Sequence, residues 1–254
     1  MRLTILGSGT LVPQGQRGAP GYAVNTPGAA EVLLFDSGSG TLGRAARAGL
    51  DWRCVNHVFY THYHPDHTLD LVSFLFASNY APPGPRTRPL AVYGPAGLED
   101  FYGHLTTAWP SIVPQHYDLD LRVLDHGGSV HIDGGWRVSS MAMDHGNSGG
   151  LGYRVEHGGR VLTLSGDTQY CDNLVRLAEN ADLLVCECSS DEANRVEGHM
   201  TPEQVARAAS ESGAKRVLIT HVYPPLVPTE LADQCGQLLG ESVQPGNDLQ
   251  SYEV

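Results

Sequence analysis

Four apolar stretches of this chain end in a histidine or an aspartate. The runs "HVFYTH", "VSSMAMDH", "VLTLSGD" and "RVLITH" close at His62, His145, Asp167 and His221. Short apolar runs bounded by glycine or polar residues predict buried β-strands. Strand ends that share one edge of a sheet direct their following loops to a common place, where chemistry is usually mounted. We therefore expect these four side chains to lie together at the edge of a sheet.

The first of these strand ends is dense in ionisable side chains. The segment "THYHPDHTLD" places His62, His64, Asp66 and His67 within six positions. Imidazoles and carboxylates are costly to bury unless something pairs with them. One histidine at a strand end is usually a turn or surface residue, but four such side chains in one loop indicate a metal site.

Together the strand ends supply seven candidate metal ligands. Zinc takes imidazole nitrogen and carboxylate oxygen in sites of about four ligands. Seven ligands are too many for one such ion and suit two ions if one carboxylate bridges them. Two ions about 3.5–4 Å apart can activate water and bind both oxygens of a displacement. The seven candidates are His62, His64, Asp66, His67, His145, Asp167 and His221.

The rest of the pattern predicts an α/β protein, with two sheets packed face to face and helices outside. With 41% apolar and 17% charged residues the chain can bury a large core, and we expect one domain over residues 1–254. Thr201, Pro202 and Gln204 predict a capped helix start, and Gly213 its end. Helices are expected over 41–49, 67–80, 96–109, 173–181 and 201–213. Strands are expected over 2–7, 30–40, 55–60, 90–94, 117–125, 129–133, 136–145, 150–157, 160–168, 182–189 and 215–221.

The net charge limits the kinds of binding partner that we expect, and the cysteine content indicates the cellular compartment. The net charge is −12, from 16 basic and 28 acidic residues, which argues against binding of extended nucleic acid. A small, anionic substrate held at a metal is still compatible with this charge. Five cysteines without a secreted-type framework favour reduced thiols in the cytoplasm. We expect no signal peptide and no membrane span.

The order of these residues resembles that of the metallo-β-lactamase superfamily. Several further stretches are similar to its ribonuclease Z-like branch, and the resemblance covers nearly the whole chain. The first motif is the most specific, and the accessory stretches are moderately so. The pattern is His62-x-His64-x-Asp66-His67 followed by His145, Asp167 and His221, and the accessory stretches are "ILGSGTLVP", "FDSGSGT", "VYGPAGL", "GLGYRV", "LSGDT" and "HMTPEQVARAA" with "KRVLITH".

The resemblance implies a four-layer αβ/βα sandwich with two divalent ions, zinc first and manganese or iron as alternatives. One ion would be held by His62, His64 and His145, and the other by Asp66, His67 and His221. Asp167 would bridge both. A hydroxide between the ions would be the nucleophile, and Asp66 would also orient it.

Two further residues gain a role from the same resemblance. His199 precedes the helix that starts at Thr201 and is either an exposed turn histidine or, as in that branch, a donor to a phosphate or leaving-group oxygen. Glu187 would be its partner. The branch has His-Glu-Ala where this chain has Cys186-Glu187-Cys188. The loss of the first histidine puts any relay through it in doubt, and we interpret the two cysteines as buried rather than metal-binding.

The substrate expectation rests on a departure from ribonuclease Z. There, a long insertion between the "GYRI"-like strand and the "SGDT"-like motif forms an arm that grips tRNA. Here only "EHGGRVLTL" separates the two motifs. We therefore expect a small phosphodiester as substrate rather than a tRNA 3′ end.

Other functions are also compatible with the sequence. They are a lactonase, thioesterase or other ester or amide metallohydrolase, a tRNA 3′ processing endonuclease, and a non-hydrolytic metal-binding protein. The family also suggests a homodimer. Arg86 and Arg88, in a proline-rich loop, and Tyr223 are candidates for substrate contact, with a solvated loop favoured for the two arginines.

Overall fold

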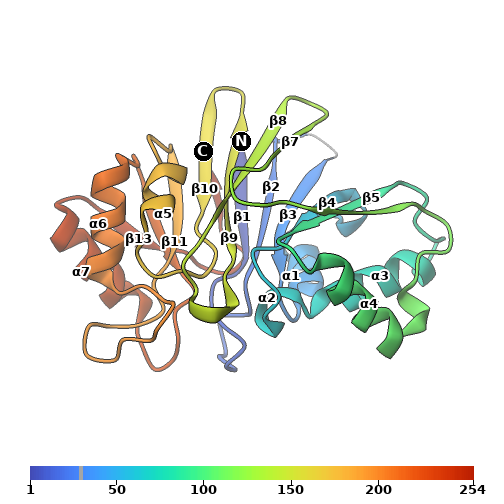
Figure 1. The fold of residues 1–254 in the computed structure, drawn as a ribbon, viewed down its shortest axis with the longest axis horizontal. Helices are drawn as coiled ribbons and strands as arrows, with labels where there is room; N and C mark the ends of the chain where they lie inside the picture. Colours follow the sequence, from blue (N-terminus) through green and yellow to red (C-terminus); the bar gives the residue numbers. More distant parts are fainter. Residues whose placement is uncertain (29–30) are drawn as a thin grey trace.

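The computed structural model describes residues 1–28 and 31–254, and in this part of the chain two seven-stranded sheets pack face to face (Figure 1). The first sheet has the order β14-β1-β2-β3-β4-β5-β6 and the second β13-β12-β11-β10-β9-β8-β7. The first comprises β14 (Ser251–Glu253), β1 (Arg2–Gly7), β2 (Gly21–Asn25), β3 (Val32–Ser37), β4 (Val55–Phe59), β5 (Leu90–Gly94) and β6 (Leu119–Val123). The second comprises β13 (Val243–Pro245), β12 (Val217–Thr220), β11 (Leu183–Glu187), β10 (Arg160–Leu164), β9 (Leu151–His157), β8 (Trp136–Ala142) and β7 (Ser129–Ile132).

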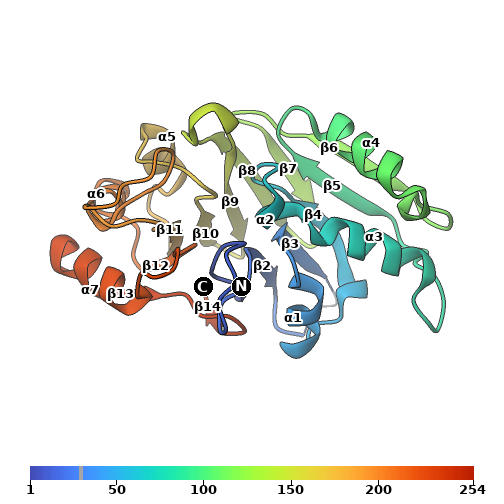
Figure 2. The same cartoon turned by 90° about the horizontal axis from the view of Figure 1, so that it is seen from below.

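Helices cover the outer face of each sheet, as the view from below shows (Figure 2). The first sheet carries α1 (Thr41–Arg47), α2 (Pro65–Thr68), α3 (Asp70–Tyr80) and α4 (Leu98–Ala108). The second carries α5 (Asp172–Leu177), α6 (Pro202–Ser212) and α7 (Pro228–Leu239). Short 3-10 turns lie at η1 (Trp52–Cys54), η2 (Pro110–Ile112) and η3 (Gly146–Ser148). The expected α/β sandwich is therefore confirmed.

Three apolar clusters hold the four layers together. The largest lies between the sheets and includes Phe35, Phe59 and Tyr153, whose rings contact one another. The other two lie between each sheet and its own helices. No helix in the described part of the chain combines the length and apolarity that crossing a bilayer requires.

Every predicted helix and strand is present, with differences in the bounds. The helix expected over 67–80 begins earlier, because Pro65 suits a first helical turn, and is divided into α2 and α3 at Leu69. The strand expected from residue 30 begins at Val32, and Ala30 itself lies outside the described residues. The strands β2, β13 and β14 and the helix α7 were not predicted from the sequence, and β13 and β14 are only three residues long.

Strand direction explains how the candidate ligands converge. In the second sheet β10, β11 and β12 are parallel, and β8 shares their direction because β9 is antiparallel to both β8 and β10. His145, Asp167 and His221 therefore follow strand ends at one edge of this sheet. His62 follows β4 of the other sheet. The four strand ends meet at one end of the fold, as expected, but they come from both sheets and not from the edge of a single sheet.

Candidate functional site

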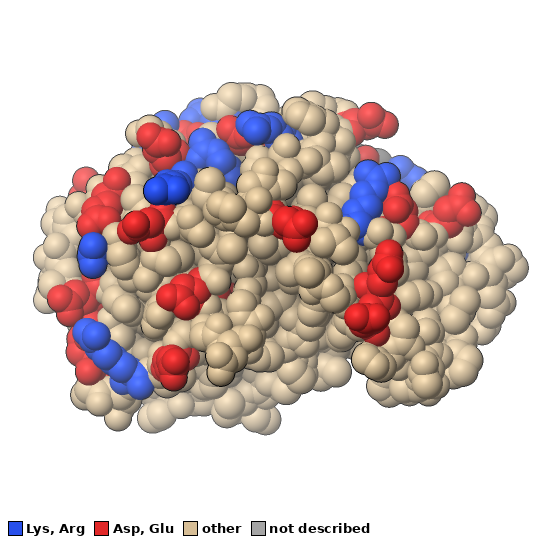
Figure 3. Space-filling view, viewed as in Figure 1, with Lys and Arg blue, Asp and Glu red and all other residues tan. Residues whose placement is uncertain are grey.

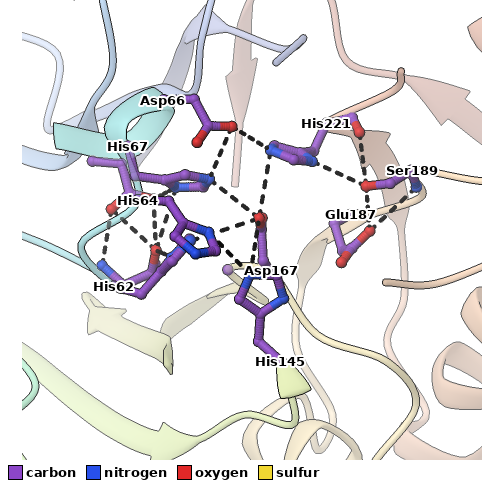
Figure 4. Close-up of polar contacts among 12 residues, drawn as sticks. His62, His64, Asp66, His67, His145, Asp167, Glu187, Ser189 and His221 are labelled. Atoms are coloured by element: carbon purple, nitrogen blue, oxygen red, sulfur yellow. Dashed lines mark hydrogen bonds and ion pairs between the residues drawn. The ribbon is translucent and has the colours of Figure 1, made fainter. Parts of the chain in front are cut away.

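All seven candidate ligands lie in one cluster at the ends of the two facing sheets (Figure 4). The loop after β4 and the start of α2 supply His62, His64, Asp66 and His67. Pro65 at the first position of α2 turns the chain there, so Asp66 and His67 fall in its first turn. Loops after β8, β10 and β12 supply the other three residues.

Asp167 occupies the centre of the cluster. Figure 4 shows its carboxylate between the imidazoles that converge from both sheets. The Asp167 side chain is 4% exposed, so this carboxylate is shielded from bulk water. Its Oδ2 atom lies 3.3 Å from His67 Nε2, 3.6 Å from His221 Nε2, 3.8 Å from His62 Nε2 and 3.9 Å from His145 Nε2.

The remaining ligand atoms fall into two groups of three around Asp167. In each group the three ligand atoms lie within 4.8 Å of one another, a spacing that can hold one metal ion. This spacing brings together residues that are up to 155 positions apart in the sequence, such as Asp66 and His221. One group is His62, His64 and His145, and the other is Asp66, His67 and His221.

Every imidazole in the cluster has one nitrogen anchored away from the centre. Such an anchor fixes the tautomer and leaves the other nitrogen to bind a metal. Four rings are anchored through Nδ1, whereas His64 is anchored through Nε2 and turns Nδ1 inward, 3.3 Å from His145 Nε2. The anchors are Thr61 Oγ1 for His62 (3.0 Å), Ser148 Oγ for His64 (3.0 Å), Asp36 Oδ2 for His67 (2.7 Å), the Gly198 carbonyl for His145 (2.9 Å) and Ser189 Oγ for His221 (3.0 Å).

The inward-facing atoms fit a cation. Nε2 of His62 and Nε2 of His67 are buried and have no hydrogen-bond partner in the described part of the chain. A buried polar atom without a partner is rare in folded proteins and calls for an ion or a water. Imidazole nitrogens and carboxylate oxygens are the ligands that zinc and similar divalent metals take.

The pKa values of Asp167 and His62, at the centre of the cluster, are shifted from their usual values. Burial alone would raise the pKa of Asp167, but the neighbouring His221 and His67 outweigh it and hold that pKa well below its usual range. Burial is the main cause that lowers the pKa of His62 well below its usual value. A carboxylate that stays ionised beside a neutral imidazole is the state in which both bind metal.

Asp36 is a site residue that the sequence analysis missed. It follows β3's apolar run, at a positive φ of 53°, and accepts hydrogen bonds from the Thr61 amide (2.9 Å) and Thr61 Oγ1. It also anchors His67. The available signal was its position, since it too lies at the end of an apolar strand in "VLLFDSG".

His199 and Glu187 lie beside the cluster, in contact with each other. His199 Nδ1 is 2.8 Å from Glu187 Oε1, and the His199 ring lies 4.9 Å from that of His145. Burial lowers the pKa of His199, but the hydrogen bond and charge of Glu187 outweigh it and raise that pKa above its ordinary value. Glu187 also accepts from the Thr168, Ser189 and Met200 amides.

Of the other residues singled out in the sequence, only Tyr223 is found beside the cluster. The Tyr223 ring lies 5.7 Å from that of His221 and 5.9 Å from that of His199, so it borders the site. The solvated position favoured for Arg86 was wrong: its side chain is buried away from the cluster, bonded to Asn56 and to the carbonyls of its own loop. That loop contacts η1, before β4, whereas the cluster follows β4. Cys186 and Cys188 are buried, and no metal-capable group in the described residues includes a cysteine.

The segment between the "GLGYRV" and "SGDT" motifs, where an arm was expected to be absent, is a tight hairpin. β9 ends at His157 and β10 begins at Arg160, with Gly158 and Gly159 between them at φ of 57° and 75°. A two-residue turn with positive φ at both positions matches the twist of paired strands and favours glycine. The described chain therefore has no inserted element at this point.

The fold and the site define a hydrolase with the metallo-β-lactamase fold. Residues 32–222 match the family model of the β-lactamase superfamily domain, and the chain belongs to that superfamily. The cluster of histidines and aspartates is of the kind that binds divalent metals.

Its relatives lie in the ribonuclease Z branch. The chain is 26% identical to the ribonuclease Z of Methanothermobacter thermautotrophicus, over all of this chain and 97% of that protein. It is 25% identical to the short form of human tRNase Z, with a TM-score of 0.80 over 100% of this chain and 99% of that one. The metallo-β-lactamase fold protein YhfI from Bacillus subtilis has the same fold, with a TM-score of 0.86 at 21% identity over 100% of this chain and 99% of its own.

Proposed function

We propose that this hydrolase is a dinuclear metal-dependent phosphodiesterase with both ions held around Asp167. The observation that carries the proposal is the position of Asp167 Oδ2, within 3.9 Å of imidazole nitrogens from both three-residue groups. One carboxylate between two such groups suits a bridging ligand. Zinc suits these ligands, as do manganese and iron.

In this assignment each group of three holds one ion. His62, His64 and His145 hold the first, and Asp66, His67 and His221 hold the second. Bound ions would supply an activated water and would neutralise the charge of the phosphate. The protein residues then have to orient the water, move protons and keep the ligands in place.

Asp66 and His199 are assigned the proton-handling roles. The Asp66 carboxylate reaches His221 Nε2 with one oxygen, at 3.2 Å. Its position at the edge of the cluster suits it to orient the attacking water. Glu187 holds His199 through Nδ1 and leaves Nε2 to donate a proton to the departing oxygen.

A small phosphodiester is the substrate that the surface and the hairpin favour. The hairpin between β9 and β10 offers no arm for a long partner. On the face in Figure 3, Lys and Arg are scattered among Asp and Glu and form no continuous basic patch. Extended nucleic acid binds through such patches.

RNA 3′ ends are the second candidate, and the relatives favour them. Proteins named ribonuclease Z and tRNase Z match this chain over almost their whole length. An RNA is not a small molecule, so these names weigh against the first choice. The alignment with the archaeal ribonuclease Z spans 309 positions against 254 residues here, so that relative contains segments that this chain lacks.

The compartment that fits this proposal is the cytoplasm. All five cysteines are free in the structure, and Cys186, Cys188 and Cys235 are buried. Free thiols are typical of reducing compartments.

The proposal is tested with purified protein loaded with zinc or manganese. We expect turnover of bis(p-nitrophenyl) phosphate, and a loss of at least about 10³-fold in kcat/KM in His64→Ala, because one ion loses a ligand. His104→Ala is the matched control, since His104 is exposed on α4 outside the cluster, and it should retain full activity.

A panel of substrates distinguishes the two candidate functions from each other and from lactonase and thioesterase activity. It contains the phosphodiester, a tRNA precursor with a 3′ extension, a lactone and a thioester. Faster kcat/KM on the precursor would favour RNA processing. Turnover of the lactone or thioester alone, or none at all by protein holding two ions, would contradict a phosphodiesterase.

A further inference from the structure

His221, the last of the seven clustered residues along the chain, has a backbone conformation that its surroundings must hold. Its φ is 57°, in the left-handed region that residues other than glycine seldom adopt. Because β12 ends one residue earlier, at Thr220, this conformation sets the direction in which the imidazole leaves the strand. A backbone of this kind persists only when neighbouring groups fix it.

Two buried serines bond to the backbone of His221. Ser189 Oγ donates to the His221 carbonyl oxygen at 2.9 Å and lies 3.0 Å from Nδ1 of the ring (Figure 4). The His221 amide donates to the carbonyl oxygen of Ser8 at 2.8 Å. Ser8 directly follows β1 of the first sheet and has no exposed surface. The position of Ser8 is therefore part of what places His221.

Ser8 is in turn held by Asp248, a carboxylate near the end of the chain. The amide and the hydroxyl of Ser8 both donate to Asp248 Oδ1, at 2.9 and 2.7 Å. The Gly18 amide donates to Asp248 Oδ2 at 2.8 Å. Arg44 Nε lies 3.8 Å from the same oxygen, and only 11% of the Asp248 side chain is exposed. One carboxylate thus holds the start and the end of the loop between β1 and β2.

The segment that carries Asp248 is itself fixed to both sheets. The Gly246 amide donates to the carbonyl of Ile219 in β12 at 2.8 Å, and the Leu249 amide donates to that of Ile5 in β1 at 2.7 Å. Hydrogen bonds to an ionised carboxylate are shorter and stronger than those between neutral groups. Asp248 is therefore a firm anchor for Ser8.

We propose that Asp248 is a positioning residue of the metal centre, which acts through Ser8 on the backbone of His221. Its carboxylate keeps the Ser8 carbonyl where that oxygen accepts from the His221 amide. Without the carboxylate, buried donors of Ser8 and Gly18 lose their partner and the loop between β1 and β2 is released. His221 then loses a fixed acceptor for its amide. This inference rests on the metal centre of the proposed function.

The test compares Asp248→Ala with Asp182→Ala as a matched control. The Asp182 side chain is also mostly buried and accepts from a backbone amide, that of Val161, at 2.9 Å. Asp182 precedes β11, which is parallel to β10 and β12, so it lies at the end of the sheet opposite to the cluster. Both variants should lower the Tm of the metal-free protein by about 4 °C or more, because each leaves buried donors without a partner.

Zinc retention separates the two variants. Graded chelator is added to zinc-loaded protein, and bound zinc is measured by elemental analysis. In Asp248→Ala the first ion should leave at about 10-fold lower chelator concentration, the lower end of the range for partners of metal ligands, because Asp248 acts through Ser8. Asp182→Ala should retain zinc like the unaltered protein. Asp248→Asn keeps an oxygen for Ser8 and should retain zinc better than Asp248→Ala.

Ser8→Ala gives a second route, in case Asp248→Ala does not fold. It keeps the carbonyl that binds His221 and removes one bond to Asp248, so the first ion should leave at about 3-fold lower chelator concentration, the size of one hydrogen bond. Thr4→Val is its matched control. Thr4 Oγ1 bonds to Ser251 Oγ at 2.8 Å and so joins β1 to β14 rather than to Asp248. It should not change zinc retention.

Two results would overturn the positioning role and leave the phosphodiesterase proposal standing. One is zinc retention in Asp248→Ala equal to that of the unaltered protein, and the other is an equal loss in Asp248→Ala and Asp182→Ala. An unaltered protein that retains zinc as expected but does not turn over the phosphodiester would overturn the proposed function alone. An unaltered protein that binds no divalent ion would overturn both.

Discussion

At the scale of single residues, the site depends on which nitrogen of each imidazole faces inward. His199 illustrates this outside the ligand set. Its ring lies nearly parallel to that of His221, at 12° and 5.6 Å, and Glu187 fixes its Nδ1. The ring is thereby held with one nitrogen free at the border of the cluster. That geometry suits a proton donor.

We predict that His199→Asn lowers kcat for a phosphodiester with an alkoxide leaving group by about 10²- to 10⁴-fold, the usual size of a general-acid contribution. Bound zinc should stay at the level of the unaltered protein, because His199 is not assigned as a ligand. Steady-state kinetics with elemental analysis measures both. A substrate with a better leaving group should lose less rate. Full activity in this variant would remove His199 from the mechanism.

At the scale of elements, short local signals place the site residues. α6 shows this best. Thr201 and Gln204 form a capping box, Pro202 occupies the first turn, and Gly213 ends the helix at a φ of 67°. The Thr201 amide donates to Gln204 Oε1 at 3.2 Å. This cap fixes the segment in which His199 lies two residues earlier.

We predict that Thr201→Ala lowers the free energy of unfolding by about 1 kcal/mol, in the range measured for lost N-caps, because the hydroxyl that caps α6 and donates to Glu192 Oε1 is removed. Urea unfolding, at constant metal content, gives the difference. Thr107→Ala is the matched control on α4, where the hydroxyl bonds, among the described residues, only to the Gly103 carbonyl of its own helix. This control should change stability by less than about 0.5 kcal/mol. Equal losses in the two variants would show that the cap contributes nothing specific.

At the scale of the whole molecule, the cluster joins the two sheets. His62, His64, Asp66 and His67 belong to the first sheet's loops, and His145, Asp167 and His221 to those of the second. An ion bound by residues from both sheets binds the folded chain and not the unfolded one. Binding of this kind stabilises a fold by about 2.7 kcal/mol per site when the free ion is at 100 times its Kd.

We predict that removing the metal lowers Tm by about 10 °C or more, because a loss of 1 kcal/mol shifts Tm by about 2–4 °C in a chain of this size. Calorimetry before and after chelation measures the shift, and added zinc should restore the original Tm. His64→Ala should show a smaller shift, since it disturbs one site. An unchanged Tm after complete removal of zinc would contradict ligand sharing between the sheets.

The seven clustered residues and the α/β class could be predicted from the sequence, because both depend on residues that lie close together in the chain. An apolar strand followed by a ligand is visible within ten residues, as in "VLLFDSG" or "RVLITH", and helix caps are equally local. Two features became visible only in the folded chain: His62 lies near His145 across the two sheets, and Asp36, Ser148 and Ser189 anchor imidazoles of the cluster. These contacts join residues up to 84 positions apart, and no local pattern encodes them. The short strands β13 and β14 escaped prediction for the same reason, since pairing with β12 and β1 defines them rather than their own three residues.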